Sequence, residues 1–361
     1  MRPRQYLCDM GAGDGQQIDK GVREAGDRRV SLPFGLATAI GSLPHFDPGE
    51  AVDFVLRHVP GLPAAPSLPA RSPREGMLAQ AATGMHGVRV TDEGSLVLDL
   101  EVLDPETGPD DVGFGGDAFV GLRAFLTAVA DRSGPIKVQL TGPVTLGIGL
   151  NMNGAPVDVA FAAAGVAVRA RAAALLRLLE ERVPQCTPVV FLDEPGLVGA
   201  LDPDFPLPTE TALDLVSSTL AVLEHGAITG VHCCGKADWN AVLQAGPQIL
   251  SLPIDADVES SAGAFAQHLE RGGWFAWGAV PTDRPIGSTP ELLWRELSQM
   301  WCRLVQDGCD PVRLRTQALI TPVCGLASHG VTQAEQVMEF TAQLADRLHD
   351  QAIGVRLSVG A

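Results

Sequence analysis

One histidine and two cysteines in this chain could together bind a metal ion. His232 and Cys234 lie in the run H-C-C-G at the end of an apolar stretch, and Cys324 lies 90 positions after Cys234, in T-P-V-C-G-L. Side chains alternate faces along an extended chain, so His232 and Cys234 should point one way and Cys233 the other. Two thiolates and one imidazole suit Zn²⁺, and three protein ligands leave one position for a substrate. The alternative is a cluster of buried cysteines without metal, since free cysteine is often buried.

Zinc with cysteine ligands favours one kind of chemistry over others. A thiol bound to Zn²⁺ loses its proton well below the free pKa of roughly 8.5 and is then a nucleophile at neutral pH. The same ion could activate water for hydrolysis. Two thiolate ligands reduce the Lewis acidity of the ion, which favours alkylation of a substrate thiol. These residues therefore predict zinc as the cofactor and a small thiol as the substrate.

Acidic and small residues follow two other apolar runs. The run F-L-D-E-P-G places Asp193 and Glu194 at a predicted strand end, where one carboxylate could bind a substrate ammonium group and the other could orient a loop. The alternative is that they cap the following helix. The run I-G-S, residues Ile40, Gly41 and Ser42, would bring backbone N–H groups and a hydroxyl close to a ligand, because Gly41 has no Cβ.

Short apolar runs alternate with helical patterns from about residue 36 onward, and these elements must position the site. The predicted strands are Leu36–Pro44, a weak one at Pro63–Leu68, Ile136–Pro143, Pro188–Pro195, Ile228–Gly235, Ile249–Ile254, Trp274–Pro281 and Ala318–Cys324. The predicted helices are Pro48–His58, Asp117–Arg132, Val157–Arg182, Thr209–His225, Ala262–Arg271, Pro290–Gln306 and Thr332–Asp350. Val88–Val90 and Ser95–Leu100 flank Asp92-Glu93-Gly94, which predicts a β-hairpin inserted after the second strand.

The alternation of strands and helices predicts the fold class. It implies parallel pairing through right-handed crossovers, and about eight such units predict an α/β fold, a (β/α)₈ TIM barrel, as a single domain over residues 33–361. The alternative is an open doubly wound sheet, but no G-x-G-x-x-G follows the first predicted strand. In a barrel the catalytic groups lie at the C-terminal ends of strands, where Asp255 and Asp283 also fall. Residues 1–32, polar and rich in glycine, predict a flexible extension.

The composition argues against several classes of partner. The net charge of −17 argues against nucleic acid and against an anionic membrane surface. Seven cysteines, two of them adjacent, fit a reducing cytoplasm better than a disulfide framework. The chain has no run of 18 or more uninterrupted apolar residues and no apolar signal-peptide core near its start. We therefore expect a cytoplasmic protein without a membrane or nucleic-acid partner.

Five of these runs together resemble the catalytic barrel of cobalamin-independent methionine synthase, within the uroporphyrinogen-decarboxylase-like superfamily. They are I-G-S, T-G-P-V-T at Thr141–Thr145, L-D-E-P at Leu192–Pro195, H-C-C-G and C-G-L, and the resemblance covers roughly residues 36–350. That family uses zinc to activate homocysteine, which takes a methyl group from a folate. The resemblance implies that His232, Cys234 and Cys324 bind zinc, that Asp193 binds the homocysteine ammonium group, and that the Ile40–Ser42 backbone contacts its carboxylate.

The chain departs from the family pattern mainly where the methyl donor would bind. The family's fourth zinc ligand, a Glu, has no counterpart in I-L-S-L-P-I-D, so Asp255 is the nearest substitute. The family's proton-donor His is replaced near Asp283, and its folate-binding aromatic residue falls near Gly149. The N-terminal barrel of the long methionine synthases also has no counterpart. The donor is therefore left open between a folate and a methylated corrinoid protein.

The expected function is zinc-dependent transfer of a methyl group to a small thiol, most simply homocysteine to give methionine. Such an enzyme would resemble a 5-methyltetrahydropteroyltriglutamate–homocysteine S-methyltransferase, with Asp193, Glu194 and Asp283 as candidate catalytic residues. One alternative is a cofactor-free decarboxylase of the uroporphyrinogen type, which needs a basic cleft for which only Arg71 and Arg74 are near. The other is a non-catalytic thiol- or metal-binding barrel that serves a partner protein.

Overall fold

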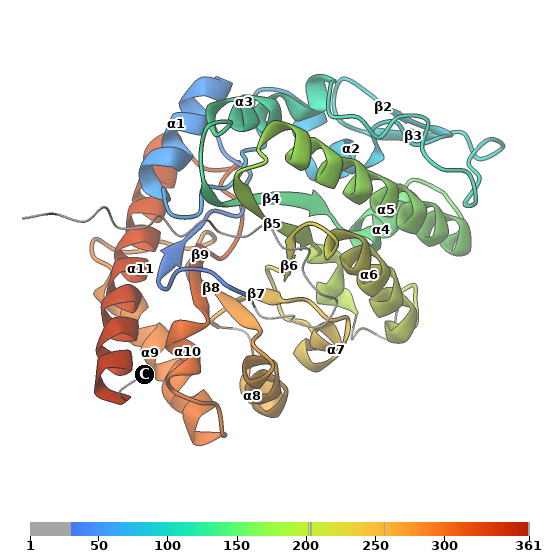
Figure 1. Ribbon diagram of the computed structural model, residues 1–361. Helices are drawn as coiled ribbons and strands as arrows, with labels where there is room; N and C mark the ends of the chain where they lie inside the picture. The colour runs from blue at the N-terminus through green and yellow to red at the C-terminus, as the bar shows by residue number, and fades with distance from the viewer. Residues whose placement is uncertain (1–29, 201, 203, 256, 360–361) are drawn as a thin grey trace, which may run out of the picture.

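A curled parallel sheet forms the centre of the molecule (Figure 1). The computed structural model describes residues 30–359 except 201, 203 and 256, so most of the predicted extension, residues 1–29, lies outside the described residues. The seven strands in spatial order are β1 (Leu36–Ala37), β9 (Ala318–Pro322), β8 (Trp274–Val280), β7 (Ile249–Pro253), β6 (Ile228–His232), β5 (Cys186–Asp193) and β4 (Gly134–Thr141). Neighbouring strands are parallel throughout. The predicted α/β class and parallel pairing are confirmed, and the curled sheet is compatible with a TIM-like barrel.

Helices cover the outer side of this sheet (Figure 1). They are α1 (Pro48–His58), α2 (Met77–Ala82), α3 (Val120–Ala128), α4 (Pro143–Met152), α5 (Val157–Arg182), α6 (Thr209–Leu223), α7 (Trp239–Gln244), α8 (Ala262–Glu270), α9 (Glu291–Gln306), α10 (Arg313–Thr316) and α11 (Val331–Val359). Short 3₁₀ helices lie at Pro73–Glu75, Asp117–Phe119, Pro195–Gly199 and Glu259–Ser261. Each of the seven predicted helices has a counterpart among these. Helix α4 was missed because seven of its ten residues are buried, which leaves it without the polar face that marks an amphipathic helix.

Local sequence explains where individual helices begin and which face they bury. Asp47 caps α1 by accepting a hydrogen bond from the N–H of Glu50 at 2.9 Å, and Pro48 occupies the first helical position. Helix α9 buries five large residues at helical spacing against the sheet: Leu293, Leu297, Met300, Trp301 and Leu304. Both helices therefore follow directly from capping and periodicity in the sequence.

The segment between α1 and α2 spans the gap between the two edge strands, β1 and β4. On one side the backbone of Lys137 in β4 exchanges hydrogen bonds with Pro63 and Ala65, at 2.8 and 2.9 Å. On the other side the N–H of Ser67 donates to the carbonyl of Gly41 at 3.1 Å. The predicted second strand is thus present only as isolated parallel bridges, because its prolines lack the N–H groups that a continuous ladder needs. We call this segment, residues 59–76, the seam.

The first predicted strand is also shorter than expected, because regular pairing ends at Ala37. Gly41, four residues further on, has a φ of +143°, which only glycine adopts easily. The chain nevertheless continues alongside β9, with the N–H of Thr38 donating to the carbonyl of Ile320 at 3.0 Å. The irregular backbone at Gly41 places Ile40–Ser42 at the C-terminal edge of the sheet, beside the seam.

Two apolar clusters hold the fold together. The larger lies between the outer face of the sheet and the helices. The smaller fills the space that the sheet encloses, at the end where the strands begin. Its members include Val189 and Phe191 from β5 and Trp274 from β8. Val30 and Leu32, at the end of the predicted extension, are buried in this smaller cluster. Apolar side chains therefore close one end of the enclosed space, while polar groups gather at the other end.

An antiparallel hairpin lies outside the ring of helices (Figure 1). It pairs β2 (Val88–Val90) with β3 (Leu96–Leu98) in the chain between α2 and α3. Arg171 of α5, 4 % exposed, ties this excursion to the body of the protein through hydrogen bonds to the carbonyls of Thr83 and Gly113. Its guanidinium also lies 5.7 Å and 5.2 Å from the ring centroids of Phe114 and Phe119. The excursion is therefore fixed to α5 rather than loosely attached.

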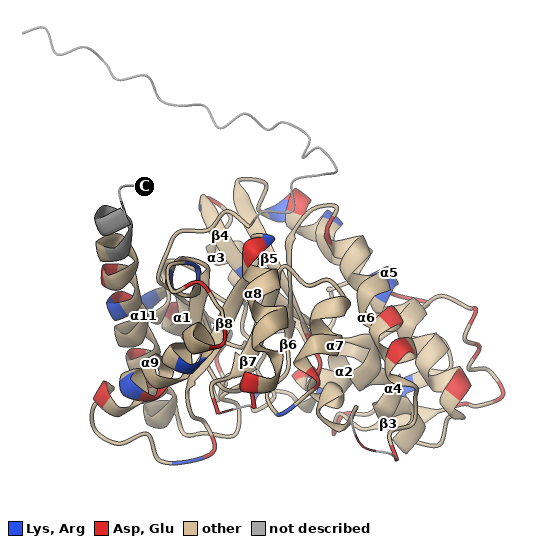
Figure 2. Ribbon diagram, turned by 90° about the horizontal axis from the view of Figure 1, so that it is seen from below, with Lys and Arg blue, Asp and Glu red and all other residues tan. Residues whose placement is uncertain are grey.

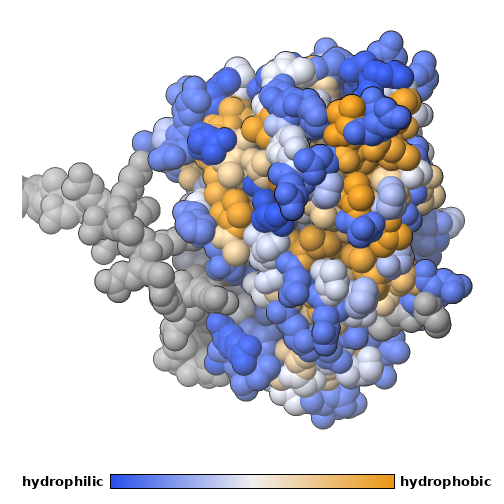
Figure 3. Space-filling view, turned by 90° about the vertical axis from the view of Figure 1, so that its right-hand side faces the viewer, coloured by the Kyte–Doolittle hydropathy of each residue, from blue (hydrophilic) through white to orange (hydrophobic). Residues whose placement is uncertain are grey.

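By length and composition alone, α5 is long and apolar enough to cross a membrane. It is the one helix among the described residues of which this is true. However, 56 % of its most apolar stretch is buried, and the helix packs against α4 and α6. Helix α5 is therefore a core helix of the fold. The side of the molecule where these helices lie shows apolar patches interrupted by hydrophilic side chains (Figure 3). Charged residues lie mainly on helices and loops, and the strands carry few of them (Figure 2).

Candidate functional site

His232, Cys234 and Cys324 come together at the C-terminal end of the sheet, although β6 and β9 are not neighbouring strands. His232 ends β6, Cys234 follows two residues later, and Cys324 lies just beyond β9. The side chains of His232 and Cys234 both hydrogen-bond to the sulfur of Cys324. Nδ1 of His232 lies 2.9 Å from Oγ of Ser251 on β7, which orients the ring and leaves Nε2 available.

The two thiols of this group differ in proton affinity, while the adjacent Cys233 has another environment. Hydrogen bonds from Cys234 and from His232 lower the pKa of Cys324, and the same contact with Cys324 raises the pKa of Cys234. Cys233 is fully buried in the larger apolar cluster, where burial raises its pKa to about 11. It faces away from the site.

A cavity of about 200 Å³ opens beside Cys234. Its lining includes Asp255 after β7 and Asp283 after β8. Asp255 is exposed, and its Oδ2 lies 3.7 Å from Nη1 of Arg284 rather than against the sulfur atoms. Asp283 is exposed as well. The two acids predicted from the sequence thus share one cavity with Cys234, and neither is held in contact with it.

Asp193 ends β5 beside His232, its register partner on β6. It is 7 % exposed, and its Oδ1 is buried without a hydrogen-bond partner among the described residues. Burial raises the pKa of Asp193, while the positive charge of Lys137 opposes that rise. A buried carboxylate oxygen with no partner is costly, and a ligand that donates hydrogen bonds, such as an ammonium group, would satisfy it.

Glu194, the other acid of this run, is engaged differently. Its Oε1 accepts a hydrogen bond from the N–H of Val144 at 2.9 Å. Its Oε2 accepts from the N–H and the hydroxyl of Thr145, at 2.8 and 2.6 Å. Burial raises the pKa of Glu194 to about 7, and these hydrogen bonds oppose the rise. A Cβ at Gly142 would overlap this carboxylate, so the glycine of T-G-P-V-T leaves room for it. Glu194 thus caps α4 and joins the ends of β4 and β5.

Replacing Glu194 with glutamine should lower the free energy of unfolding by about 2 kcal/mol, because the new NH₂ group would face N–H donors at the start of α4. Urea unfolding followed by circular dichroism would measure this loss. Asp193→Asn, which removes charge at a residue with an unpartnered oxygen, is the matched comparison and should cost less. Equal stability of Glu194→Gln and wild type would contradict the capping role.

The Ile40–Ser42 segment lies beside the residues that follow β9, and it does not line the cavity beside Cys234. The carbonyl oxygens of all three residues already accept hydrogen bonds: from Nζ of Lys137, and from the N–H groups of Ser67 and Leu326. A Cβ at Gly325 would overlap Oγ of Ser42, so the segment touches the residue after Cys324. With its carbonyls engaged, the segment presents chiefly donor groups, which suit an anion such as a carboxylate.

Two interior residues next to this segment, Lys137 and Gln139 in β4, were missed by the sequence analysis. They lie on the inner face of the strand, and Lys137 is only 2 % exposed. The signal was present, since Lys137, Gln139 and Thr141 alternate with the apolar Ile136, Val138 and Leu140. Polar residues at every second position in a buried strand indicate that its inner face makes polar contacts.

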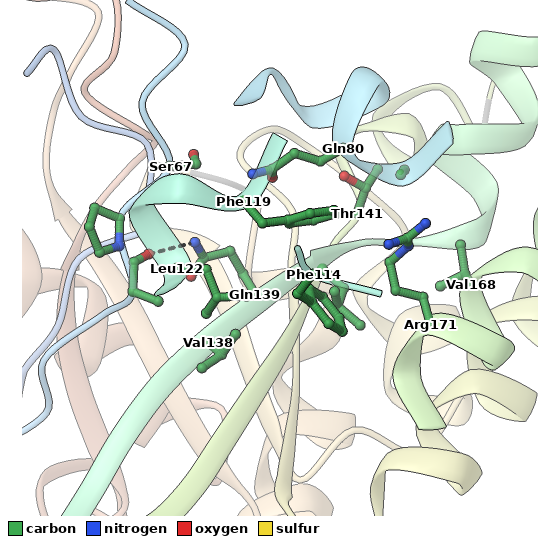
Figure 4. Close-up of a pocket in the computed structure, with 14 residues that line it drawn as sticks. Ser67, Gln80, Phe114, Phe119, Leu122, Val138, Gln139, Thr141, Val168 and Arg171 are labelled. Carbon is green, nitrogen blue, oxygen red and sulfur yellow. Dashed lines mark hydrogen bonds between the residues drawn. The ribbon is translucent and has the colours of Figure 1, made fainter. Parts of the chain in front are cut away.

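A second, smaller cavity adjoins this part of β4 (Figure 4). It has a volume of about 30 Å³, room for one or two water molecules and too little for a substrate. Gln139, Thr141 and Gln80 line it together with Phe114, Phe119 and Arg171. This cavity is therefore too small to be the candidate substrate site.

The donor atoms of the site fit zinc in their chemistry. The sulfur of Cys324 contacts both Cys234 and His232, and Ser251 orients the imidazole as outer-shell partners of metal ligands do. In the part of the chain that the structure describes, no group of three or more His, Cys, Asp or Glu side chains already has the spacing of a complete metal site. The side chains of His232, Cys234 and Cys324 would therefore have to move for all three to bind one ion.

No family model matches the sequence, and no curated protein matches it. Among solved structures, the chain is similar to a B12-independent methionine synthase from Shewanella sp. W3-18-1 in complex with selenomethionine. The TM-score is 0.54 and the identity 14 %, over 89 % of this chain and 99 % of that chain. A structure from Listeria monocytogenes, provisionally assigned as a vitamin-B12-independent methionine synthase, has a TM-score of 0.48 at 13 % identity with the same coverage. The resemblance to cobalamin-independent methionine synthases is thus confirmed at the level of the fold, through the Shewanella structure.

Proposed function

We propose that this protein is a zinc-dependent methyltransferase that transfers a methyl group to the thiol of a small amino acid, with homocysteine as the expected acceptor and methionine as the product. The observation that carries the proposal is the meeting of His232, Cys234 and Cys324 beside the buried carboxylate of Asp193. The shared fold supports it, as does the selenomethionine bound to the Shewanella protein. We further propose a complete (β/α)₈ barrel in which the seam takes the place of the second strand.

The chain's own residues would bind the two ends of the amino acid. Asp193 would accept hydrogen bonds from the ammonium group through its unpartnered Oδ1. The donor groups of Ile40–Ser42 would bind the carboxylate from the opposite side. These two contacts fix the backbone of the substrate, so its thiol extends towards His232 and the two cysteines. Such positioning supplies much of the rate of a reaction between two bound groups.

His232, Cys234 and Cys324 are the residues that would hold zinc. When bound, zinc would lower the pKa of the substrate thiol and keep it as a thiolate near neutral pH. Asp255 is the candidate fourth ligand, because it lines the same cavity as Cys234 and would be freed if Arg284 moved away. In the transfer the sulfur of the acceptor forms a bond to the methyl carbon as the bond between the methyl carbon and its donor breaks.

The methyl donor would approach through the cavity beside Cys234. We assign Asp283, on the loop after β8, the role of proton donor to the leaving group, since it lines that cavity. The candidate donors remain a folate and a methylated corrinoid protein. A cytoplasmic location fits a site with two free thiols, because a reducing environment keeps them from forming a disulfide.

The direct test combines metal analysis with a binding and an activity measurement. Purified protein should contain about one zinc per chain, and homocysteine should raise the melting temperature only when zinc is present. Methyl transfer to homocysteine should then be measured with methyltetrahydrofolate and with a methylated corrinoid protein in parallel. Metal-free protein that transfers methyl groups at the full rate would contradict the proposal. Zinc binding without transfer from either donor would favour a non-catalytic thiol- or metal-binding protein.

A further inference from the structure

Lys137 is a charged residue in the interior of the protein, and the proposed function gives it no role. Its ammonium group donates to the carbonyl of Ile40 at 2.6 Å and to Oε1 of Gln139 at 3.2 Å. It also lies 5.1 Å from the centroid of the Phe191 ring. Burial lowers its pKa to about 8, and the charge of Asp193 opposes that change. Burying an ammonium group costs several kcal/mol unless hydrogen bonds and opposite charge offset it, so a lysine here calls for an explanation.

The contacts of Lys137 lead to the Ile40–Ser42 segment. Nζ holds the carbonyl of Ile40, the residue just before Gly41. Gln139 accepts from Lys137 through one atom of its amide and donates to the carbonyl of Ala65 at 2.8 Å through the other (Figure 4). A Cβ at Gly41 would overlap this same amide, so Gln139 also supports the segment by direct contact. Lys137 and Gln139 thus lie beneath the segment and tie it to the seam.

We propose that Lys137, itself held by Gln139, is a positioning residue that fixes Ile40–Ser42 for the carboxylate of the substrate and so makes the site select amino acids over the corresponding amines. This inference rests on the proposed function, in which that segment binds the carboxylate. The seam offers no regular ladder to hold the segment in place. The hydrogen bond from Lys137 to the carbonyl of Ile40 takes over that task, and its positive charge lies on the side of the site where the anion would bind.

Lys137→Met tests the inference with a pair of ligands that differ only in the carboxylate. Methionine and its decarboxylated analogue, 3-(methylthio)propylamine, should be titrated by calorimetry into the zinc-loaded full-length protein. We expect Lys137→Met to weaken methionine binding by about 30-fold, as for loss of a charge-assisted hydrogen bond, and to leave binding of the amine within about twofold. Arg177→Met, at an exposed cation on α5, is the matched control and should change neither affinity.

Stability is the first check on the variant. Replacing a buried charge by an apolar group of similar length is often neutral or stabilising, so Lys137→Met should be recovered folded and with its zinc. If it is not, Gln139→Met keeps the cation, removes its side-chain acceptor, and should give a smaller loss of the same selective kind. Zinc content and melting temperature accompany each titration.

Three outcomes would overturn the inference. An equal loss for methionine and the amine would assign Lys137 a purely structural role, and unchanged affinities would leave it no role in binding. In both cases the proposed function would stand, because wild-type protein still binds methionine. Wild-type protein that binds neither ligand would instead contradict the proposed function, and the inference would fall with it.

Discussion

Replacing Cys324 with serine should reduce bound zinc from about one ion per chain to a trace and lower the rate of methyl transfer by about a thousandfold or more. Both His232 and Cys234 contact Cys324, so its loss removes the side chain that links the other two. A hydroxyl is a poor ligand for zinc compared with a thiolate, and His232 and Cys234 with only the candidate ligand Asp255 should not hold the ion at micromolar concentration. Metal analysis of the purified variant and a methyl-transfer assay measure the two effects.

The adjacent Cys233 supplies the matched control for this experiment. It lies next to Cys234 in the chain but is buried in the outer apolar cluster. Cys233→Ala should therefore retain zinc and activity and lose only about 1 kcal/mol of stability, as expected when one buried sulfur atom is removed. If Cys324→Ser kept its zinc while Cys233→Ala lost it, the assignment of the ligands would be wrong.

Asp193→Asn should raise the KM for homocysteine by about a hundredfold while zinc content stays at the wild-type level. Asparagine preserves the shape of the side chain and removes the negative charge that would face the substrate ammonium group. Loss of one partner from a buried charged hydrogen bond costs about 2–5 kcal/mol, which is the basis for the expected change. Steady-state kinetics with homocysteine as the varied substrate would provide the measurement.

A second ligand sharpens the interpretation of Asp193→Asn. The desamino analogue 4-mercaptobutyrate lacks the ammonium group, so its KM should be nearly the same for wild type and variant. The opposite pattern, in which kcat falls for both acceptors and KM stays constant, would mean that Asp193 acts on the reacting sulfur instead of the amino group.

The sequence predicts the convergence at this site because parallel strands bring their C-terminal ends to one edge. His232 and Cys324 are 92 positions apart, yet each follows a recognisable apolar run, and the fold alone then brings them together. The length of β1 was harder to predict, because regular pairing ends at Ala37 within an apolar run that continues to Ile40. Apolar patterns predict which residues are buried. They do not predict where the pairing between two strands ends.

Long-range polar contacts were the least accessible from the sequence. Glu194 stands beside Asp193 in one acidic pair, but it turns to the start of α4, a helix whose uniform burial hides it from periodicity. Lys137 contacts a residue 97 positions away, and nothing local in the chain indicates that contact. Such pairings depend on three-dimensional proximity, so they become visible only once the strands are placed.

The strands that surround the site should be held more rigidly on the side of β6 to β9 than on the side that the seam closes. Parallel ladders run from β9 through β8 and β7 to β6, with one irregularity between Gly278 and Val280, so backbone hydrogen bonds link the strands that lead to Cys324 and His232. Ile40–Ser42 instead borders the stretch where only isolated bridges form. Backbone fluctuations should therefore concentrate in the seam, while the hydrogen bond from Lys137 holds Ile40–Ser42 itself. In the proposed reaction, an amino acid would enter and leave past the seam, while the two sulfur atoms and the imidazole keep their spacing.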